Sequence, residues 1–213
     1  MLKVTKIRDY IYKTILPVLV ILFCCLPSNI YSNSLLEIKE DEYILGEKNA
    51  PITIIEYASL SCSHCANFHK KTLPKLIDEY VNKGKVRIIF RYFPFNYPAL
   101  IGSMALQCID KDLRYDYSSA LFELQSDWVK QDTEETKKEL YKIMQVGGMS
   151  KKDFNDCINN EDLERNILQE TIDAQNQFNI QSTPSFVING ELLVGNKPFK
   201  DFKKIIEKIL DLN

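Results

Sequence analysis

The chain has 213 residues, of which 45% are hydrophobic and 11% aromatic, so it is too rich in core-forming side chains to be disordered. With 7 Gly and 8 Pro it is neither low-complexity nor fibrous, and its length suits one domain, or one domain carrying an insertion. The net charge of -2 argues against a general nucleic-acid binder, and no uncharged apolar run is long enough to predict a standard transmembrane helix.

The N-terminal segment, residues 1–34, is organised like a secretory signal peptide. Residues 1–13 carry four basic side chains against one acid, residues 15–26 form an apolar run, and a small, polar stretch follows. We expect cleavage after Ser32 or Ser34 and export to the periplasm. The alternative is an N-terminal anchor that is not cleaved.

Two of the six cysteines, Cys24 and Cys25, lie in this segment. Phe23 is bulkier than the residue that bacterial lipidation sites favour, so we interpret both as apolar filler. Removing the four basic and one acidic side chains takes the net charge from -2 to -5, which gives no electrostatic reason to bind nucleic acid or anionic lipid. The four remaining cysteines predict disulfides in an exported protein, and they allow three pairings.

A strand, a helix and a second strand are predicted next. After Tyr-Ile-Leu-Gly at 43–46, residues 51–59 form a nearly continuous apolar run that is typical of a central strand buried on both faces. Apolar residues then recur at helical spacing from Phe68 onward, and Pro74 is expected to kink this helix. Residues 86–93 form the next strand, so the order predicts a βαβ unit with parallel strands.

Residues 98–178 are predicted to be helical. Their β signal is weak, and we expect four or five helices that form an inserted subdomain. Gly147-Gly148 is a stop signal, and Ser150 begins the helix that follows. The apolar residues at helical spacing are Ile101, Met104, Cys108, Leu121, Leu124, Leu140, Ile143 and Met144.

Sheet signals return near the C-terminus. Residues 185–188 and 191–194 flank Asn189-Gly190, the strongest short hairpin signal. A last helix is predicted from about Pro198, with an apolar face and lysines elsewhere on its surface. We interpret these lysines as a solvated face.

The chemistry is concentrated at Cys62-Ser63-His64-Cys65, where the first long strand meets the first helix. Residues three apart on a helix are neighbours, so the two sulfurs lie within disulfide reach. Cys62 is expected at the helix N-terminus, where free N–H groups and the helix dipole favour a thiolate, and His64 adds a partly cationic neighbour. Cys62 is then the nucleophile and Cys65 the resolving partner. The alternatives are a structural disulfide or half of a metal site, and a closed zinc site would need more ligands than the second histidine, His69, supplies.

Three motifs make the chain resemble the DsbA-like group of thioredoxin-fold thiol oxidoreductases, over residues 41–211. They are Ile-Ile-Glu-Tyr-Ala-Ser-Leu-Ser-Cys-Ser-His-Cys at 54–65, Phe-Arg-Tyr-Phe-Pro at 90–94, and Ser-Thr-Pro-Ser-Phe-Val-Ile-Asn-Gly at 182–190. The resemblance implies an α/β class, the thioredoxin fold with an inserted all-helical subdomain.

The expected layout has four parts. A signal peptide occupies 1–34, the first half of the thioredoxin fold with the CxxC motif occupies 35–97, the helical subdomain occupies 98–178, and the second half of the fold occupies 179–213.

The resemblance also assigns Thr183-Pro184 to the site. It implies a cis proline beside the redox pair and a preceding residue that offers backbone groups to an extended substrate peptide; from base rates alone the bond would be trans. Two residues depart from the pattern: Ser63 replaces the proline of the best-known oxidants, and Thr183 replaces a frequent valine. Because both touch the redox pair, we expect a net oxidant that is weaker than the strongest family members.

Glu56 is an acid within an apolar strand, and a buried carboxylate needs a reason. The resemblance implies a proton relay to Cys65, and the alternative is a strand-end glutamate that reaches solvent or a lysine. The sequence gives no comparable reason to assign a function to His69, and we interpret it as a partly exposed residue at the edge of the core. If Cys62 pairs with Cys65, then Cys108 and Cys157 remain for a structural disulfide; the alternative is two buried thiols.

The leading functional hypothesis is a periplasmic enzyme that donates its disulfide to reduced exported proteins. A membrane thiol oxidase of the DsbB type is the expected reoxidising partner, and we expect a monomer with no cofactor, no metal and no nucleic-acid partner. Disulfide isomerase or reductase activity is the second hypothesis, although the 10–16 mature residues before the first strong strand are few for a dimerisation domain. The third is a metal-binding or peptide-binding module without turnover.

Overall fold

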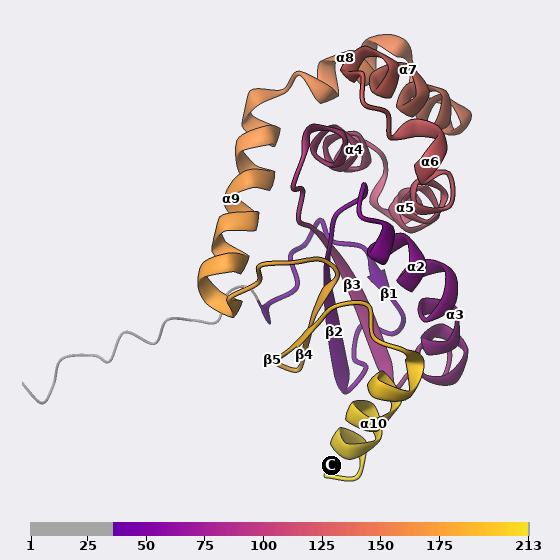
Figure 1. The fold of residues 1–213 in the computed structure, drawn as a ribbon. Coiled ribbons are helices and arrows are strands. Elements are labelled where there is room, and N and C mark those ends of the chain that lie inside the picture. The colour runs from indigo at the N-terminus through magenta and orange to yellow at the C-terminus, as the bar shows by residue number, and fades with distance from the viewer. Residues whose placement is uncertain (1–35, 213) are drawn as a thin grey trace, which may run out of the picture. The chain divides into compact units, whose positions relative to one another are not determined.

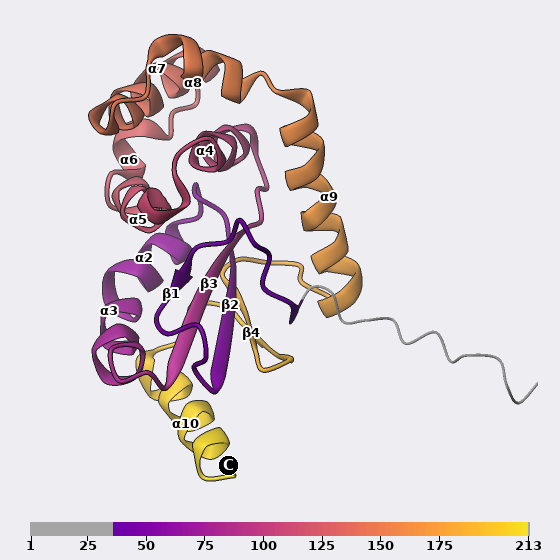
Figure 2. The same ribbon diagram turned by 180° about the vertical axis from the view of Figure 1, so that it is seen from behind.

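The computed structural model describes residues 36–212 (Figures 1 and 2). The predicted signal peptide, with Cys24 and Cys25, lies outside the described residues. Of the helices in the described part, none combines the length and the apolar character that a membrane-spanning helix needs.

A five-stranded sheet in the order β1-β3-β2-β4-β5 forms the centre of the fold. The strands are β1 (Ile44–Leu45), β2 (Ile52–Ala58), β3 (Val86–Tyr92), β4 (Ser185–Ile188) and β5 (Glu191–Val194). β2 and β3 pair in parallel, which confirms the predicted βαβ unit, and the other neighbours are antiparallel. The predicted hairpin is also confirmed, with Asn189 and Gly190 both at positive φ as a tight turn of this kind requires.

The helix between β2 and β3 is divided, as Pro74 predicts. α2 (Ser63–Lys71) is capped by Thr72, α3 (Leu73–Leu76) carries Pro74 in its first turn, and a π-helical turn (Ile77–Val81) leads to β3. Proline is tolerated in a first helical turn because the N–H it lacks would have no helical partner there.

Helices fill the region between β3 and β4. The expectation of four or five helices is wrong, since six α-helices lie here: α4 (Tyr97–Gln107), α5 (Arg114–Glu123), α6 (Gln125–Trp128), α7 (Thr133–Met144), α8 (Lys151–Ile158) and α9 (Glu161–Phe178), with 3₁₀ turns at Lys111–Leu113 and Gln145–Gly147. Side-chain oxygens of Asn96, Asp132, Ser150 and Asn160 accept backbone N–H groups at the starts of α4, α7, α8 and α9. The predicted start at Ser150 is therefore confirmed.

The expected apolar positions in this region are not all buried. Leu124 is 39% exposed, because it follows the last residue of α5 where the chain turns into the one-turn helix α6. Cys108 is exposed as the residue that follows α4. Each therefore lies beyond the helical stripe that the spacing predicted.

The two sheet faces are covered by different elements. α2, α3 and α10 (Phe199–Leu210) cover one face, where Ile52 and Ile54 of β2 pack with Phe68. The other face, with Ile55 and Tyr57, is covered by the C-terminal part of α9. Since both faces of β2 are buried, its sequence is apolar apart from Thr53 and Glu56. Figure 1 shows α4 to α8 grouped beyond the end of the sheet from which α2 begins.

Candidate active site

The CxxC motif lies at the junction of the sheet and the helical region. Cys62 is the N-cap residue of α2, and Cys65 is one turn further along the helix. Cys62 is half-buried, whereas Cys65 is fully buried among the apolar side chains that join the sheet to α4 and α5. Both cysteines are free thiols, so the structure represents the reduced form of the pair.

The environment of Cys62 favours its thiolate. A hydrogen bond from the Cys65 thiol lowers the pKa of Cys62 most strongly, and the Thr183 side chain and the backbone N–H groups of Cys65 and His64 add to this. Burial opposes them, and the net effect lowers the pKa of Cys62 to about 5. The start of α2 supplies these N–H groups because the first residues of a helix have no intrahelical acceptors.

The environment of Cys65 favours its thiol. Burial raises the pKa of Cys65 strongly, and its hydrogen bond to Cys62 and the negative charge of Glu56 raise it further. The pair is therefore chemically asymmetric: the accessible sulfur is a thiolate at neutral pH, and the buried sulfur keeps its proton.

The loop before β4 closes the site on the other side of Cys62. The Thr183–Pro184 peptide bond is cis, the form that the resemblance implied. The Thr183 carbonyl oxygen lies 3.4 Å from Cys62 Sγ, which donates to it in the thiol form. The structure therefore brings together residues 121 positions apart in the sequence.

His64, by contrast, is exposed at the start of α2 and contributes its backbone N–H to the Cys62 sulfur. The role predicted for its imidazole stays a prediction.

Glu56 is buried below the redox pair, on the β2 face that α2 covers. It is 1% exposed, and its carboxylate is bonded to His69 Nε2 at 3.0 and 3.2 Å. The glutamate therefore reaches neither solvent nor a lysine. His69 is partly exposed as a residue, as expected, but its side chain is only 6% exposed and is the partner of this carboxylate, a role that the sequence analysis did not assign to it.

One positioning contact was missed by the sequence analysis. The Gln125 side-chain amide, in the first turn of α6, donates to the carbonyl oxygens of Leu60 at 2.8 Å and Cys62 at 3.1 Å. These bonds tie the helical region to the turn that carries the nucleophile. No local pattern could have indicated them, because the partners are more than 60 residues apart.

The second cysteine pair lies away from this site. Cys108, after α4, is bonded to Cys157 of α8, the pairing that the sequence analysis expected. Cys157 is buried and Cys108 is exposed, so the bond lies at the surface of the helical region. Within residues 36–212, no group of three His, Cys, Asp or Glu side chains is placed to hold a metal ion.

Comparison with known proteins agrees with this arrangement. The family described as thioredoxin matches residues 39–208. The chain is 31% identical to alpha-DsbA1 of Wolbachia pipientis, whose crystal structure superposes with a TM-score of 0.77 over 85% of this chain and 100% of that one. It is 30% identical to the probable disulfide bond formation protein D of Bacillus cereus, over 78% of this chain and 77% of that protein.

Other relatives are longer. The putative protein-disulfide oxidoreductase of Rickettsia felis is 23% identical over 82% of this chain, which spans 62% of that protein's length. The structure of BdbD from Bacillus subtilis, at 23% identity and a TM-score of 0.71, shares the fold.

The chain is thus a thioredoxin-fold protein with a CxxC motif at the start of a helix and helices inserted between β3 and β4. It belongs to the thioredoxin family, and within that family it is DsbA-like.

Proposed function

We propose that the protein is a thiol:disulfide oxidoreductase that introduces disulfides into exported proteins. The observation that carries this proposal is the asymmetry of the pair: the pKa of half-buried Cys62 is lowered to about 5, and the thiol of Cys65 is buried. A thiolate that is stable at neutral pH is a good leaving group, which favours release of an oxidised substrate.

The reaction starts from the Cys62–Cys65 disulfide. A substrate thiolate attacks Cys62 Sγ, a mixed disulfide forms, and the electron pair of the broken S–S bond leaves on Cys65 Sγ, which takes up a proton. A second substrate thiolate then attacks the substrate sulfur of the mixed disulfide, and Cys62 leaves as a thiolate. The substrate is oxidised by two electrons, and the enzyme pair is reduced by two.

Three groups have supporting roles in this proposal. The backbone at Thr183, next to Cys62 Sγ, receives the extended substrate segment, as the matching loop does in the family. Glu56 relays the proton of Cys65, which its position on the buried face of β2 and its effect on the Cys65 pKa support. The Cys108–Cys157 bond stabilises the helical region.

The remaining proposals concern the cell. The N-terminal segment 1–34 directs export to the periplasm, a DsbB-like membrane thiol oxidase reoxidises the pair, and the protein acts as a monomer. The composition of the segment supports export, and the name of the relative from Bacillus cereus, probable disulfide bond formation protein D, supports a role in disulfide formation.

Two variants test the reaction. Cys62→Ser should abolish oxidation of a reduced model protein, and Cys65→Ser should trap mixed disulfides with substrates, because the resolving thiol is then missing. Alkylation of the reduced protein at pH 6 should label Cys62 first. Preferential labelling of Cys65 would contradict the assignment of the nucleophile.

The direction of the reaction is tested by the equilibrium potential of the pair against glutathione. A potential as reducing as that of thioredoxin, about -270 mV, would favour a reductase instead. An inert pair that binds one equivalent of copper or zinc would favour the metal-binding alternative.

A further inference from the structure

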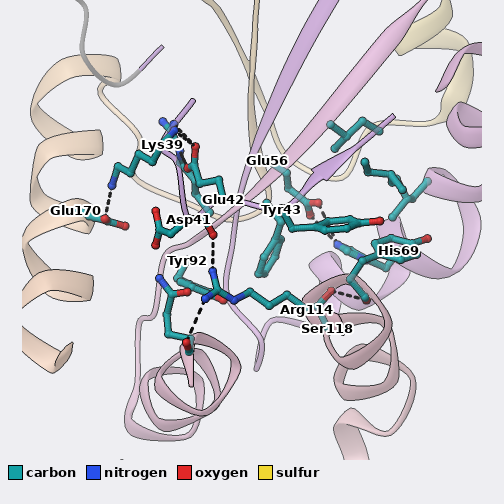
Figure 3. A pocket seen from close by; sticks show the side chains of 17 residues that line it. Lys39, Asp41, Glu42, Tyr43, Glu56, His69, Tyr92, Arg114, Ser118 and Glu170 are labelled. Atoms are coloured by element: carbon teal, nitrogen blue, oxygen red, sulfur yellow. Dashed lines mark hydrogen bonds and ion pairs between the residues drawn. The ribbon is translucent and has the colours of Figure 1, made fainter. Parts of the chain in front are cut away.

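A small cavity is lined by Glu56 and by its partner His69. It has a volume of about 50 Å³, which exceeds the roughly 10–15 Å³ that a cavity needs to hold an ordered water. Neither cysteine is among the residues that line it. Its lining includes both buried Glu56 and exposed Asp41 (Figure 3), so we take it as the route between the carboxylate and the surface.

The cavity gathers polar atoms that have no partner. In the part of the chain that the structure describes, the buried side-chain nitrogens and oxygens without a hydrogen bond are His69 Nδ1, Gln107 Oε1 and Arg114 Nε. All three residues line this one cavity. A buried polar atom without a partner costs free energy, and three residues that carry such atoms around one space of this size favour ordered water there.

His69 is fixed between this space and the carboxylate. Its Nε2 is bonded to Glu56, and its ring packs on Phe122 with ring centroids 4.1 Å apart and edge-on against Phe90 at 6.0 Å. With the ring held in this way, Nδ1 is the nitrogen that is left for water. An imidazole can accept a proton on one nitrogen and release a proton from the other, which a lysine or an amide cannot do.

The reaction creates a need for such a route. Each time the enzyme disulfide is reduced, Cys65 Sγ receives an electron pair and takes up one proton, and each reoxidation releases that proton. Cys65 is 0% exposed, so solvent does not reach the sulfur directly. In the proposed reaction, a substrate segment bound next to Thr183 would also cover the Cys62 side of the pair.

We infer that His69 exchanges the Cys65 proton between Glu56 and water in this cavity, so that protons reach the buried sulfur from the side of the domain. On reduction of the disulfide, water gives a proton to Nδ1, Nε2 gives one to Glu56, and Glu56 gives one to Cys65 Sγ; reoxidation reverses these transfers. His69 is thus a positioning and relay residue that acts through Glu56. The inference rests on the proposed function and extends it to residues outside the CxxC motif.

Two variants test the route by different means. His69→Gln keeps a side-chain donor for Glu56 but has no second exchangeable ring nitrogen. Ser118→Leu leaves Glu56 and His69 unchanged and fills the cavity, since Ser118 is a buried lining residue. The matched control is Ile158→Val, which removes a methyl group from the buried face of α8, away from the cavity.

The measurement is the rate at which a small dithiol reduces the oxidised full-length protein, in water and in deuterium oxide. We expect both variants to be slower by roughly tenfold or more and to show a larger solvent isotope effect than the wild type, because proton delivery then limits the rate. Ile158→Val should change neither quantity. If His69→Gln does not fold, Ser118→Leu decides alone.

Three results would overturn the inference: wild-type rates in the variants, slower rates with the wild-type isotope effect, or the same change in Ile158→Val. If the wild-type protein itself does not oxidise the dithiol, the proposed function fails instead.

Discussion

The low pKa of Cys62 makes the stability of the reduced protein depend on pH. The pKa of about 5 in the folded protein lies below the ordinary value of 9.0 for a cysteine thiol, so folding favours the thiolate. This stabilisation is fully present above about pH 9, and it is lost as the pH falls through about 5. A pH of 7 lies two units above the pKa of Cys62 in the folded protein, and these two units correspond to about 2.7 kcal/mol without screening. Because Cys62 is partly exposed, we expect the thiolate to contribute roughly 1–2 kcal/mol at this pH.

The assay is urea denaturation of the reduced protein between pH 4 and pH 8, for the wild type and for Cys62→Ala. The difference in unfolding free energy between the two isolates the thiolate, since the other groups titrate alike in both. This difference should shrink by roughly 1–2 kcal/mol from pH 7 to pH 4. A parallel titration of thiolate ultraviolet absorbance should give the pKa directly. Parallel pH profiles, or a Cys62 pKa above about 7, would refute the reasoning.

Three further predictions concern the scaffold. Replacing Cys108 and Cys157 by alanine should lower the unfolding free energy by about 4 kcal/mol for a separation of 49 residues, on the chain-entropy model, and an unchanged urea midpoint would contradict it. Arg91→Met should lower the unfolding free energy by about 3–5 kcal/mol, because it leaves the Glu42 carboxylate, which is 11% exposed, without its guanidinium partner. Adding Glu42→Gln should restore part of this loss. If calorimetry shows that the effects of the two substitutions simply add, the coupling is disproved. Gln125→Ala should lower the unfolding free energy by about 1–3 kcal/mol, because two hydrogen bonds to backbone carbonyls are lost. Isosteric Gln125→Glu should lower it more, because a carboxylate would then face two carbonyl oxygens. A Gln125→Glu variant with the wild-type thermal unfolding midpoint would argue against these bonds.

Local patterns predicted the elements whose residues are close in sequence. β2 and β3 are mainly apolar because both faces of the sheet are covered. Asn189-Gly190 fixes a hairpin because both residues tolerate positive φ. The CxxC motif at the end of β2 likewise placed both sulfurs on one turn of α2.

The remaining features depend on contacts between distant segments. The number of helices was underestimated because α6 is a single turn, too short to show any periodicity. His69 lies 13 residues from Glu56, and only the packing of α2 on β2 makes them partners. Pairs of this kind leave no periodic signal, so the sequence indicated that Glu56 needed an explanation without revealing which residue supplies it.

For Thr183, the family resemblance and the structure lead to opposite expectations. The resemblance associates threonine at this position with less purely oxidising relatives. In the structure, however, a hydrogen bond from the Thr183 side chain lowers the pKa of Cys62, although less than the bond from Cys65 does. The bond stabilises the thiolate, which exists only in the reduced form of the pair, so it should make the pair more oxidising.

Thr183→Val removes this donor and keeps the shape of the side chain. We therefore expect a higher Cys62 pKa and a pair that is more reducing by about 20 mV, for a partly exposed bond of about 1 kcal/mol at about 30 mV per 1.4 kcal/mol. The stabilisation of the Cys62 thiolate, roughly 1–2 kcal/mol, raises the reduction potential of the pair by about 20–40 mV. The potentials of thioredoxin and DsbA differ by about 150 mV, which corresponds to about 7 kcal/mol of stabilisation of the reduced form. The wild-type potential should consequently lie between those two values. Equilibration with glutathione, followed by alkylation and mass analysis, measures both proteins; a Thr183→Val pair that is more oxidising than the wild type would show that the threonine acts on the disulfide form instead.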